Sequence, residues 1–223
     1  MTPATVAGLS RLAGVEVAAL TDHNTVRNGP AFIEACNAYG VSPLIGMELT
    51  TAEEVHMICL FLTYDEAKAF EDKVWESRVY IRNKPQYFGR QLLMNADDEI
   101  IGEEENLLPN ATRLGLSAAY QLVRDYGGVC YPAHVDRQAN GIIAMLGTFP
   151  PEPPFRIAEF RDPANAKTYP EQYPNLQGLM VVYGSDSHRP DAVPEQAEFY
   201  LDVGDQGTPA EAVFRRLQDQ MNS

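Results

Sequence analysis

The sequence is short of basic residues. Its 223 residues include 17 Lys and Arg against 31 Asp and Glu, which gives a formal net charge of −14. Proteins that bind nucleic acid neutralise its phosphates with Lys and Arg. We therefore expect no nucleic-acid partner. A small phosphorylated substrate is still compatible with this charge, because bound metal ions reverse the local field.

Long apolar runs and cysteines are also scarce. No stretch approaches ~18 consecutive apolar residues, and the chain does not open with a basic segment followed by an apolar one. The only cysteines are Cys36, Cys59 and Cys130, far apart and in apolar or helical surroundings. Such spacing favours free, buried thiols in a reducing compartment. These absences predict a soluble cytoplasmic protein with no membrane partner.

Strand and helix signals alternate along most of the chain. We find no internal repeat, low-complexity tract or linker, so a single domain over residues 1–223 is expected. Residues 86–108 read as an inserted hairpin, and the Pro-rich residues 150–174 read as mostly irregular. Strands are expected at 15–21, 41–46, 55–63, 128–131, 156–160 and 178–183, and helices at 2–14, 30–39, 65–81, 112–126 and 208–220. This alternation predicts an α/β protein with a mostly parallel sheet or barrel.

The four histidines all fall beside the ends of expected strands. In α/β folds, functional groups collect where strands end. A single histidine at a strand end is more often a hydrogen-bonding residue than a ligand. Here, however, all four histidines of the sequence occupy such positions, which the simpler explanation does not account for. The positions are His23, His56, His134 and His188.

The spacing of Glu48 and His56 restricts the chain between them. A crossover between parallel strands needs about a dozen residues or more, and this link is shorter. The chain must therefore bend or form a hairpin, which keeps both side chains at one end of the sheet. Four histidines, Glu48 and Asp186 can then converge on one rim.

Imidazole and carboxylate groups without cysteine suit zinc, manganese or iron, and do not suit a structural thiolate zinc site. One carboxylate that bridges two ions, for which Glu48 is the best placed, would allow a centre of two or three metals. Such a centre activates water and holds phosphoryl oxygens. The sequence therefore predicts a hydrolytic metal site.

Four segments together resemble the motifs of the PHP (polymerase and histidinol phosphatase) family. They resemble its T-D-H, G-x-E with a following His, third His and G-S-D-x-H motifs, and they span most of the chain. The segments are Thr21-Asp22-His23-Asn24, Gly46-Met47-Glu48 with His56, Pro132-Ala133-His134, and Gly184-Ser185-Asp186-Ser187-His188.

The resemblance implies a distorted (β/α)7 barrel and hydrolysis of a small phosphomonoester by a metal-activated water. It implies that Glu48 and Asp186 are the catalytic ligands and that Glu48 bridges metals. Asp186 would serve the first ion, His56 and His134 the second, and His23 with His188 a third. Asp22 is expected either to bind metal or to orient a ligand.

One family motif has no counterpart here. Family members begin with H-x-H on the first barrel strand, whereas no histidine precedes His23. We therefore expect an incomplete barrel, fewer metals than in a complete relative, and weak or no activity. The explanations are a start site assigned too late, a trimmed chain or a natural loss, and the first is favoured because every later motif is intact.

Three polar residues are candidates for substrate binding. Arg137 and Arg189 lie close to His134 and His188, and guanidinium groups match phosphate oxygens bidentately. Surface ion pairs explain them equally well. Asn24 lies on the loop after His23. Two other functions stay open, a non-catalytic metal-binding or interaction protein and a metal-dependent amide or ester hydrolase.

Overall fold

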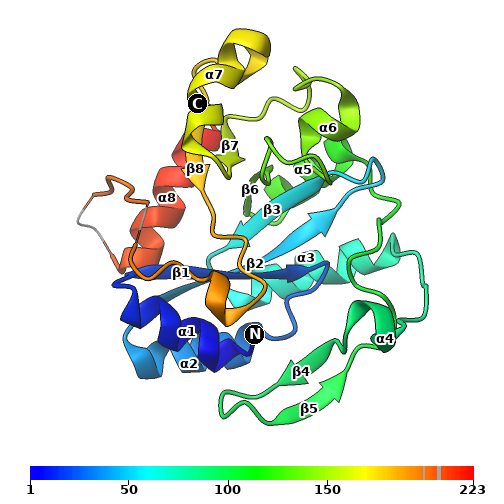
Figure 1. Cartoon of the computed structure of the whole chain (residues 1–223), viewed down its shortest axis with the longest axis vertical. Coiled ribbons are helices and arrows are strands. Elements are labelled where there is room, and N and C mark those ends of the chain that lie inside the picture. Colours follow the sequence, from blue (N-terminus) through cyan, green and yellow to red (C-terminus); the bar gives the residue numbers. More distant parts are fainter. Residues whose placement is uncertain (198, 205–206) are drawn as a thin grey trace.

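The centre of the computed structural model, which describes residues 1–197, 199–204 and 207–223, is a four-stranded sheet (Figure 1). Its strand order is β1-β2-β3-β6, with β1 parallel to β2 and β3 antiparallel to both of its neighbours. The strands are β1 (Val17–His23), β2 (Ser42–Thr50), β3 (His56–Phe61) and β6 (Val129–Pro132). All six residues of β3 are buried, as expected for a strand covered on both faces.

A second, parallel pair of strands continues from this sheet. It consists of β7 (Ile157–Phe160) and β8 (Met180–Tyr183). The chain leaving β6 lies beside β7, because the Val135 N–H donates to the Glu159 carbonyl at 2.8 Å. The ends of β6 and β7 are therefore held together.

Helices cover the sheet, and two of the longest begin with reciprocal capping boxes, Thr63 with Glu66 and Thr208 with Glu211. The helix α8 contacts β1, β2, β6 and β7. The longer helices are α1 (Pro3–Leu12), α2 (Gly29–Tyr39), α3 (Tyr64–Glu76), α5 (Leu116–Asp125) and α8 (Pro209–Met221). The short ones are α4 (Pro85–Phe88), α6 (Ile142–Leu146), η1 (Pro174–Leu176) and η2 (Pro190–Ala192).

The segment 86–108 contains an antiparallel hairpin of β4 (Leu92–Met94) and β5 (Ile100–Glu103). It projects at the bottom of Figure 1, at the opposite end from the helix α7 (Pro163–Gln172). Its turn is tied to the start of α1, since the Thr2 hydroxyl donates to Asp98 at 2.7 Å. That residues 86–108 are an insertion, and that residues 1–223 are one domain, stay predictions.

One helix, α7 (Pro163–Gln172), lies where the sequence predicted irregular chain. Its start is favourable, because Asp162 accepts the Ala164 N–H and Pro163 occupies a first-turn position that needs no N–H donor. Pro170 falls inside the helix near its end. The density of prolines was therefore misleading, because these prolines sit where a helix tolerates them or is about to end.

The fold confirms an α/β protein, and the distorted, incomplete (β/α)7 barrel stays a prediction. The central sheet was expected to be mostly parallel but is mixed, because β3 is antiparallel to both β2 and β6. The hairpin expected between Glu48 and His56 is present, because β2 and β3 pair antiparallel with Thr50 opposite His56. Cys36, Cys59 and Cys130 are buried and free, as predicted. Among the described residues, no helix is both long and apolar enough to span a membrane.

Gly46 is required by the close approach of β2 and β3. A Cβ at this position would lie 2.3 Å from the Cys59 carbonyl oxygen. We expect Gly46→Ala to lower the free energy of unfolding by about 1–3 kcal/mol, as overpacking does. In chemical denaturation the control Gly8→Ala, whose Cβ would lie 3.4 Å from the Tyr39 ring, should leave stability unchanged or raise it. Equal stability of the two variants would contradict this account.

Candidate metal centre

The Glu48 carboxylate is surrounded by the imidazoles of three histidines. Its Oε1 lies 2.7 Å from His56 Nδ1 and 3.0 Å from His134 Nε2. Its Oε2 lies 3.4 Å from His23 Nδ1. Glu48 is only 6% exposed. A buried carboxylate and three rings from four different segments thus form one compact polar cluster.

Strand pairing explains why these side chains meet. In the parallel pair of β1 and β2, His23 is opposite Glu48. In the antiparallel pair of β2 and β3, Thr50 is opposite His56. Opposite residues share a face, and so do residues two apart in one strand. His23, Glu48 and His56 therefore point to one side at one end of the sheet.

His134 arrives from the chain after β6. The preceding residue, Ala133, donates its N–H to the His56 carbonyl at 3.0 Å. His134 itself has a positive φ of 29°. This bend turns the ring toward His56, whose Nδ1 lies 3.3 Å from His134 Nε2.

The cluster fits a divalent cation. Ligand atoms of His23, Glu48 and His56 all lie within 4.8 Å of one another. The Nδ1 atoms of His23 and His134 are buried and have no hydrogen-bond partner among the described residues. An unsatisfied buried polar atom costs about 1–3 kcal/mol. A cation beside Glu48 would satisfy His23 Nδ1, whereas His134 faces Glu48 with its other ring nitrogen, Nε2. Nitrogen with carboxylate oxygen suits zinc or manganese.

The protonation states also suit metal binding, since ligands must be neutral imidazole or carboxylate. Burial lowers the pKa of His23, although Glu48 opposes this effect. Burial alone would raise the pKa of Glu48, but hydrogen bonds with His134 and His56 outweigh it and hold that pKa far below its usual range. At neutral pH, Glu48 is therefore an anion and His23 is neutral.

A second group, centred on Asp186, adjoins the cluster. Asp186 Oδ2 accepts hydrogen bonds from Arg137 at 2.8 Å and from Arg161 at 2.9 Å. His188 Nδ1 lies 3.4 Å from Asp186 Oδ1. The His188 and His23 rings are 5.8 Å apart, which joins the two groups. A pocket of about 710 Å³ opens here, and Arg137, Arg161, Asp186 and His188 line it.

The six ligands expected from the sequence therefore lie in two adjacent groups. His23, Glu48, His56 and His134 form the buried cluster, whereas Asp186 and His188 lie in the arginine-lined pocket. The structure does not bring Asp22 to the cluster, because strand alternation places it on the other face of β1 from His23. Its carboxylate accepts a hydrogen bond from Asn28 at 3.1 Å, and burial raises its pKa.

The three expected substrate contacts lie in different surroundings. Arg137 lies in the pocket, with its guanidinium directed at Asp186. Arg189 lies at the same pocket with a side chain that is 78% exposed, 3.8 Å from Asp191. Asn24 is buried, and its amide donates to the carbonyls of Leu108 and Asn110 and accepts the Thr50 N–H. Asn24 thus supports the backbone, in contrast to the expected substrate contact.

Two residues of the site, Glu159 and Arg161, were not predicted from the sequence. Glu159 is buried on β7, accepts the His134 N–H at 3.2 Å, and has its pKa raised by burial to about 7. Arg161 follows the strand. Its backbone is fixed by Asp136, which accepts the Arg161 N–H at 2.9 Å. The available signal was a glutamate inside an apolar strand, two residues before an arginine that follows the strand.

Two solved structures are similar to this chain in fold. A crystal structure from Bifidobacterium adolescentis, described as that of a candidate metal-dependent phosphoesterase, aligns with a TM-score of 0.56 at 16% identity, over 98% of this chain and 91% of that one. The lesion-specific endonuclease PfuEndoQ from Pyrococcus furiosus aligns with a TM-score of 0.55 at 13% identity, over 86% of this chain and 45% of that one. Both likenesses concern the fold.

One relative is similar in sequence over a shorter segment. The uncharacterized protein MJ1587 of Methanocaldococcus jannaschii is 38% identical over 66 residues, 30% of this chain. The matched part spans 38% of that protein's length. This likeness supports common ancestry and assigns no activity.

The prediction that this protein has no nucleic-acid partner was wrong. A protein with this fold is by its name an endonuclease, so neither the fold nor the net charge excludes nucleic-acid substrates in favour of small phosphorylated ones. Net charge sums over the whole surface, whereas recognition depends on the local field. Arg137, Arg161 and Arg189 line one pocket together with three aspartates, so this pocket does not share the excess negative charge of the whole chain.

The family expected from the motifs is confirmed. The sequence profile of the PHP domain matches residues 5–126, more than half of the chain. This range contains His23, Glu48 and His56, the three groups whose ligand atoms converge. Such relatives and this geometry support a metal-dependent hydrolase. The chain belongs to the PHP domain family.

Proposed function

We propose that this protein is a metal-dependent hydrolase of phosphoesters. The observation that carries the proposal is the buried Glu48 carboxylate with three histidines around it, one of which, His23, has an unsatisfied buried nitrogen beside the carboxylate. A cluster of this kind is costly to a fold unless a cation completes it. The arginine-lined pocket beside it supplies a place for an anionic group.

One set of residues would bind the metal ion, and another would bind the phosphate. His23, Glu48, His56 and His134 would hold the ion, with Asp186 and His188 beside it. When bound, a divalent ion lowers the pKa of a coordinated water and neutralises charge on the phosphoryl group. In hydrolysis a water oxygen bonds to phosphorus, the ester P–O bond breaks, and the leaving oxygen takes up a proton.

Arg137 and Arg161 are suited to hold the phosphoryl oxygens. Both guanidinium groups already converge on one anionic oxygen, Asp186 Oδ2. The same spacing suits an oxygen of a phosphate, for which arginine offers paired donors. Asp186 would then release them as it turns toward a metal.

The test is an assay of the protein with added Mn²⁺ or Zn²⁺ against esters of different classes. The substrates are p-nitrophenyl phosphate, bis(p-nitrophenyl) phosphate, a DNA duplex with an abasic site, p-nitrophenyl acetate and an anilide. Metal-stimulated cleavage of any of the phosphoesters supports the proposal, and the preferred one defines the ester class. Cleavage confined to the acetate or the anilide would establish an amide or ester hydrolase in its place. Metal binding without any cleavage would favour a binding protein.

Removing Arg161 should weaken substrate binding. We expect Arg161→Ala to raise the KM for the preferred phosphoester about tenfold to a hundredfold, since a hydrogen bond to a charged group contributes about 1.5–3 kcal/mol. Arg156→Ala, at the other end of β7, is the control, because its side chain contacts the Ser223 carbonyl. Steady-state kinetics in which the two variants behave alike would remove Arg161 from the site.

A further inference from the structure

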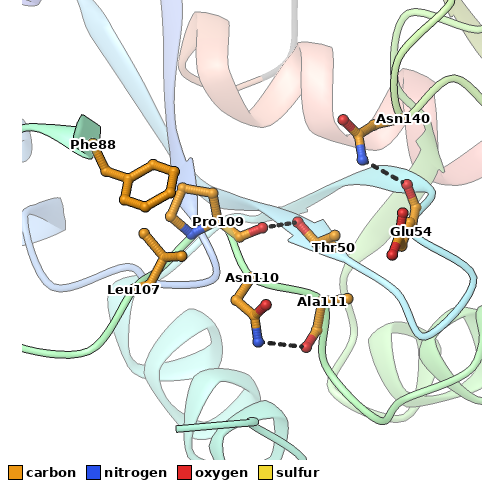
Figure 2. Close-up of a pocket in the computed structure, with 8 residues that line it drawn as sticks. All are labelled: Thr50, Glu54, Phe88, Leu107, Pro109, Asn110, Ala111 and Asn140. Atoms are coloured by element: carbon orange, nitrogen blue, oxygen red, sulfur yellow. Dashed lines mark hydrogen bonds between the residues drawn. The ribbon is translucent and has the colours of Figure 1, made fainter. Parts of the chain in front are cut away.

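A smaller pocket lies beside the metal centre, with an apolar wall and a polar wall. Its volume is about 260 Å³. Figure 2 shows Phe88, Leu107 and Pro109 on one side, and Glu54 and Asn140 on the other, with Thr50 between them. Neither the proposed metal ligands nor the arginines line it, so it calls for a separate explanation.

The pocket opens on the same face of the sheet as the metal centre. Thr50 lies two residues beyond Glu48 in β2, so their side chains share a face. Thr50 is also paired with His56 across β2 and β3. A group in this pocket would thus lie next to the proposed ligand cluster.

One loop joins this pocket to the arginine-lined one. The chain after β6 places His134 in the metal cluster, Arg137 in the arginine-lined pocket and Asn140 in the smaller pocket. The loop is tight, since a Cβ at Gly141 would lie 2.4 Å from the Arg137 carbonyl oxygen. The two pockets are therefore lined by neighbouring residues of one short loop, which also carries His134.

The walls are fixed to the metal centre by hydrogen bonds. The Asn24 amide, next to His23, holds the carbonyls of Leu108 and Asn110 at 2.7 and 2.9 Å. The His56 N–H donates to the Asn140 carbonyl, and the Asn140 amide donates to the Glu54 carbonyl, both at 2.9 Å. The pocket is therefore built together with the site and keeps a defined position relative to it.

The lining favours a flat aromatic ring that carries N–H groups. Phe88 is 61% exposed, so its ring is available for stacking. The Glu54 carboxylate makes no hydrogen bond or ion pair with any residue that the structure describes, and it accepts hydrogen bonds only. Pockets for whole small molecules measure about 300–1,000 Å³, so the volume of about 260 Å³ suits a single ring system.

We propose that this pocket binds the nucleobase of a phosphoester substrate, with the ring against Phe88 and its N–H edge toward Glu54. The inference rests on the proposed function, because the phosphate of the same ligand would lie near Arg137. It names the substrate class as nucleotidic, whether a free nucleotide or a nucleotide within a strand. Base–aromatic stacking contributes about 1–3 kcal/mol per base.

Calorimetric titration of the metal-free protein tests this proposal without turnover. The ligands are guanosine 5′-monophosphate and ribose 5-phosphate, which share the sugar phosphate and differ in the base. We expect the nucleotide to bind about tenfold or more tightly. Equal affinities would overturn the base subsite and leave phosphoester hydrolysis intact. Conversely, a failed hydrolysis assay would not affect a measured base preference.

Two substitutions locate the preference. Phe88→Ala should abolish the advantage of the nucleotide, whereas Tyr87→Ala should keep it, because Tyr87 is 77% exposed and does not line the pocket. Glu54→Gln should weaken the binding of guanosine monophosphate more than that of uridine monophosphate, because the uracil base has a single imino N–H. A preference that survives Phe88→Ala would contradict the assignment.

A short single-stranded DNA distinguishes the two sources of the base. Tighter binding of a trimer than of the mononucleotide, still dependent on Phe88, assigns the subsite to a strand. Equal or weaker binding of the trimer with the same dependence assigns it to a free nucleotide. The proposal would be overturned if Phe88→Ala changed neither the affinity for the trimer nor the affinity for the nucleotide.

Discussion

Replacing Glu48 by glutamine is expected to remove the bound metal and the hydrolytic activity together. Among the residues that the structure describes, Glu48 is the carboxylate that lies against the rings of His23, His56 and His134, and it contributes the negative charge that a divalent ion needs. Residues that only support a metal ligand cost about 10–100-fold in affinity or activity when they are changed. A central ligand should cost more, so both quantities should fall by at least about 100-fold.

Equilibrium dialysis against Mn²⁺ or Zn²⁺ with elemental analysis measures the first effect, and the preferred phosphoester measures the second. Glu53→Gln is a matched control, because Glu53 lies in the β2–β3 turn and accepts the Leu116 N–H at 2.9 Å, outside the cluster. Circular dichroism of both variants tests whether they are folded. Unchanged metal affinity in a folded Glu48→Gln protein would contradict the proposed centre.

Replacing Asp186 by asparagine is expected to separate catalysis from anion binding. The carboxylate engages Arg137 and Arg161 through a single oxygen. Loss of its charge should lower phosphoester hydrolysis about 100-fold, as expected for a residue close to the metal. The same change frees both guanidinium groups, so inorganic phosphate should bind as tightly as before or more tightly.

Calorimetric titration with inorganic phosphate and steady-state kinetics provide the two readouts. Asp191→Asn is the control, since Asp191 is exposed and lies 3.8 Å from Arg189. Parallel loss of phosphate affinity and activity in Asp186→Asn would show that Asp186 does not compete with phosphate for the arginines.

The part of the site on regular strands could be predicted from the sequence. His23 and Glu48 follow apolar runs, and the short link from Glu48 to His56 allows a hairpin and no crossover. Together these facts fix which end of the sheet the side chains occupy. The mixed α/β fold follows from the same alternation of strand and helix signals.

The parts that could not be predicted depend on tertiary contacts. Arg161 reaches the pocket because Asp136 fixes its backbone, and no local pattern encodes that contact. The sequence predicted Asn24 to be a loop residue available to substrate, but its amide donates hydrogen bonds to the carbonyls of Leu108 and Asn110. The pocket around Phe88 joins segments far apart in the chain, so only the folded structure shows it.

The net charge of the chain likewise does not show how charge is distributed over the folded protein. The net charge of −14 suggested that the protein does not bind nucleic acid, but a net charge does not show where the charged side chains lie. Folding brings Arg137, Arg161 and Arg189 to one pocket, where they balance the three aspartates that also line it, although the whole chain is strongly acidic. Local fields of this kind decide which anions approach a site.

We propose that His23, Glu48 and His56, with His134, hold a divalent metal ion. Crystals of the protein soaked in MnCl₂ and measured at a wavelength where manganese scatters anomalously test it most directly. The account predicts a strong anomalous peak between these side chains in the wild-type protein, and its loss in Glu48→Gln. A peak found only at surface carboxylates, or no peak at the cluster in the wild-type protein, would contradict it.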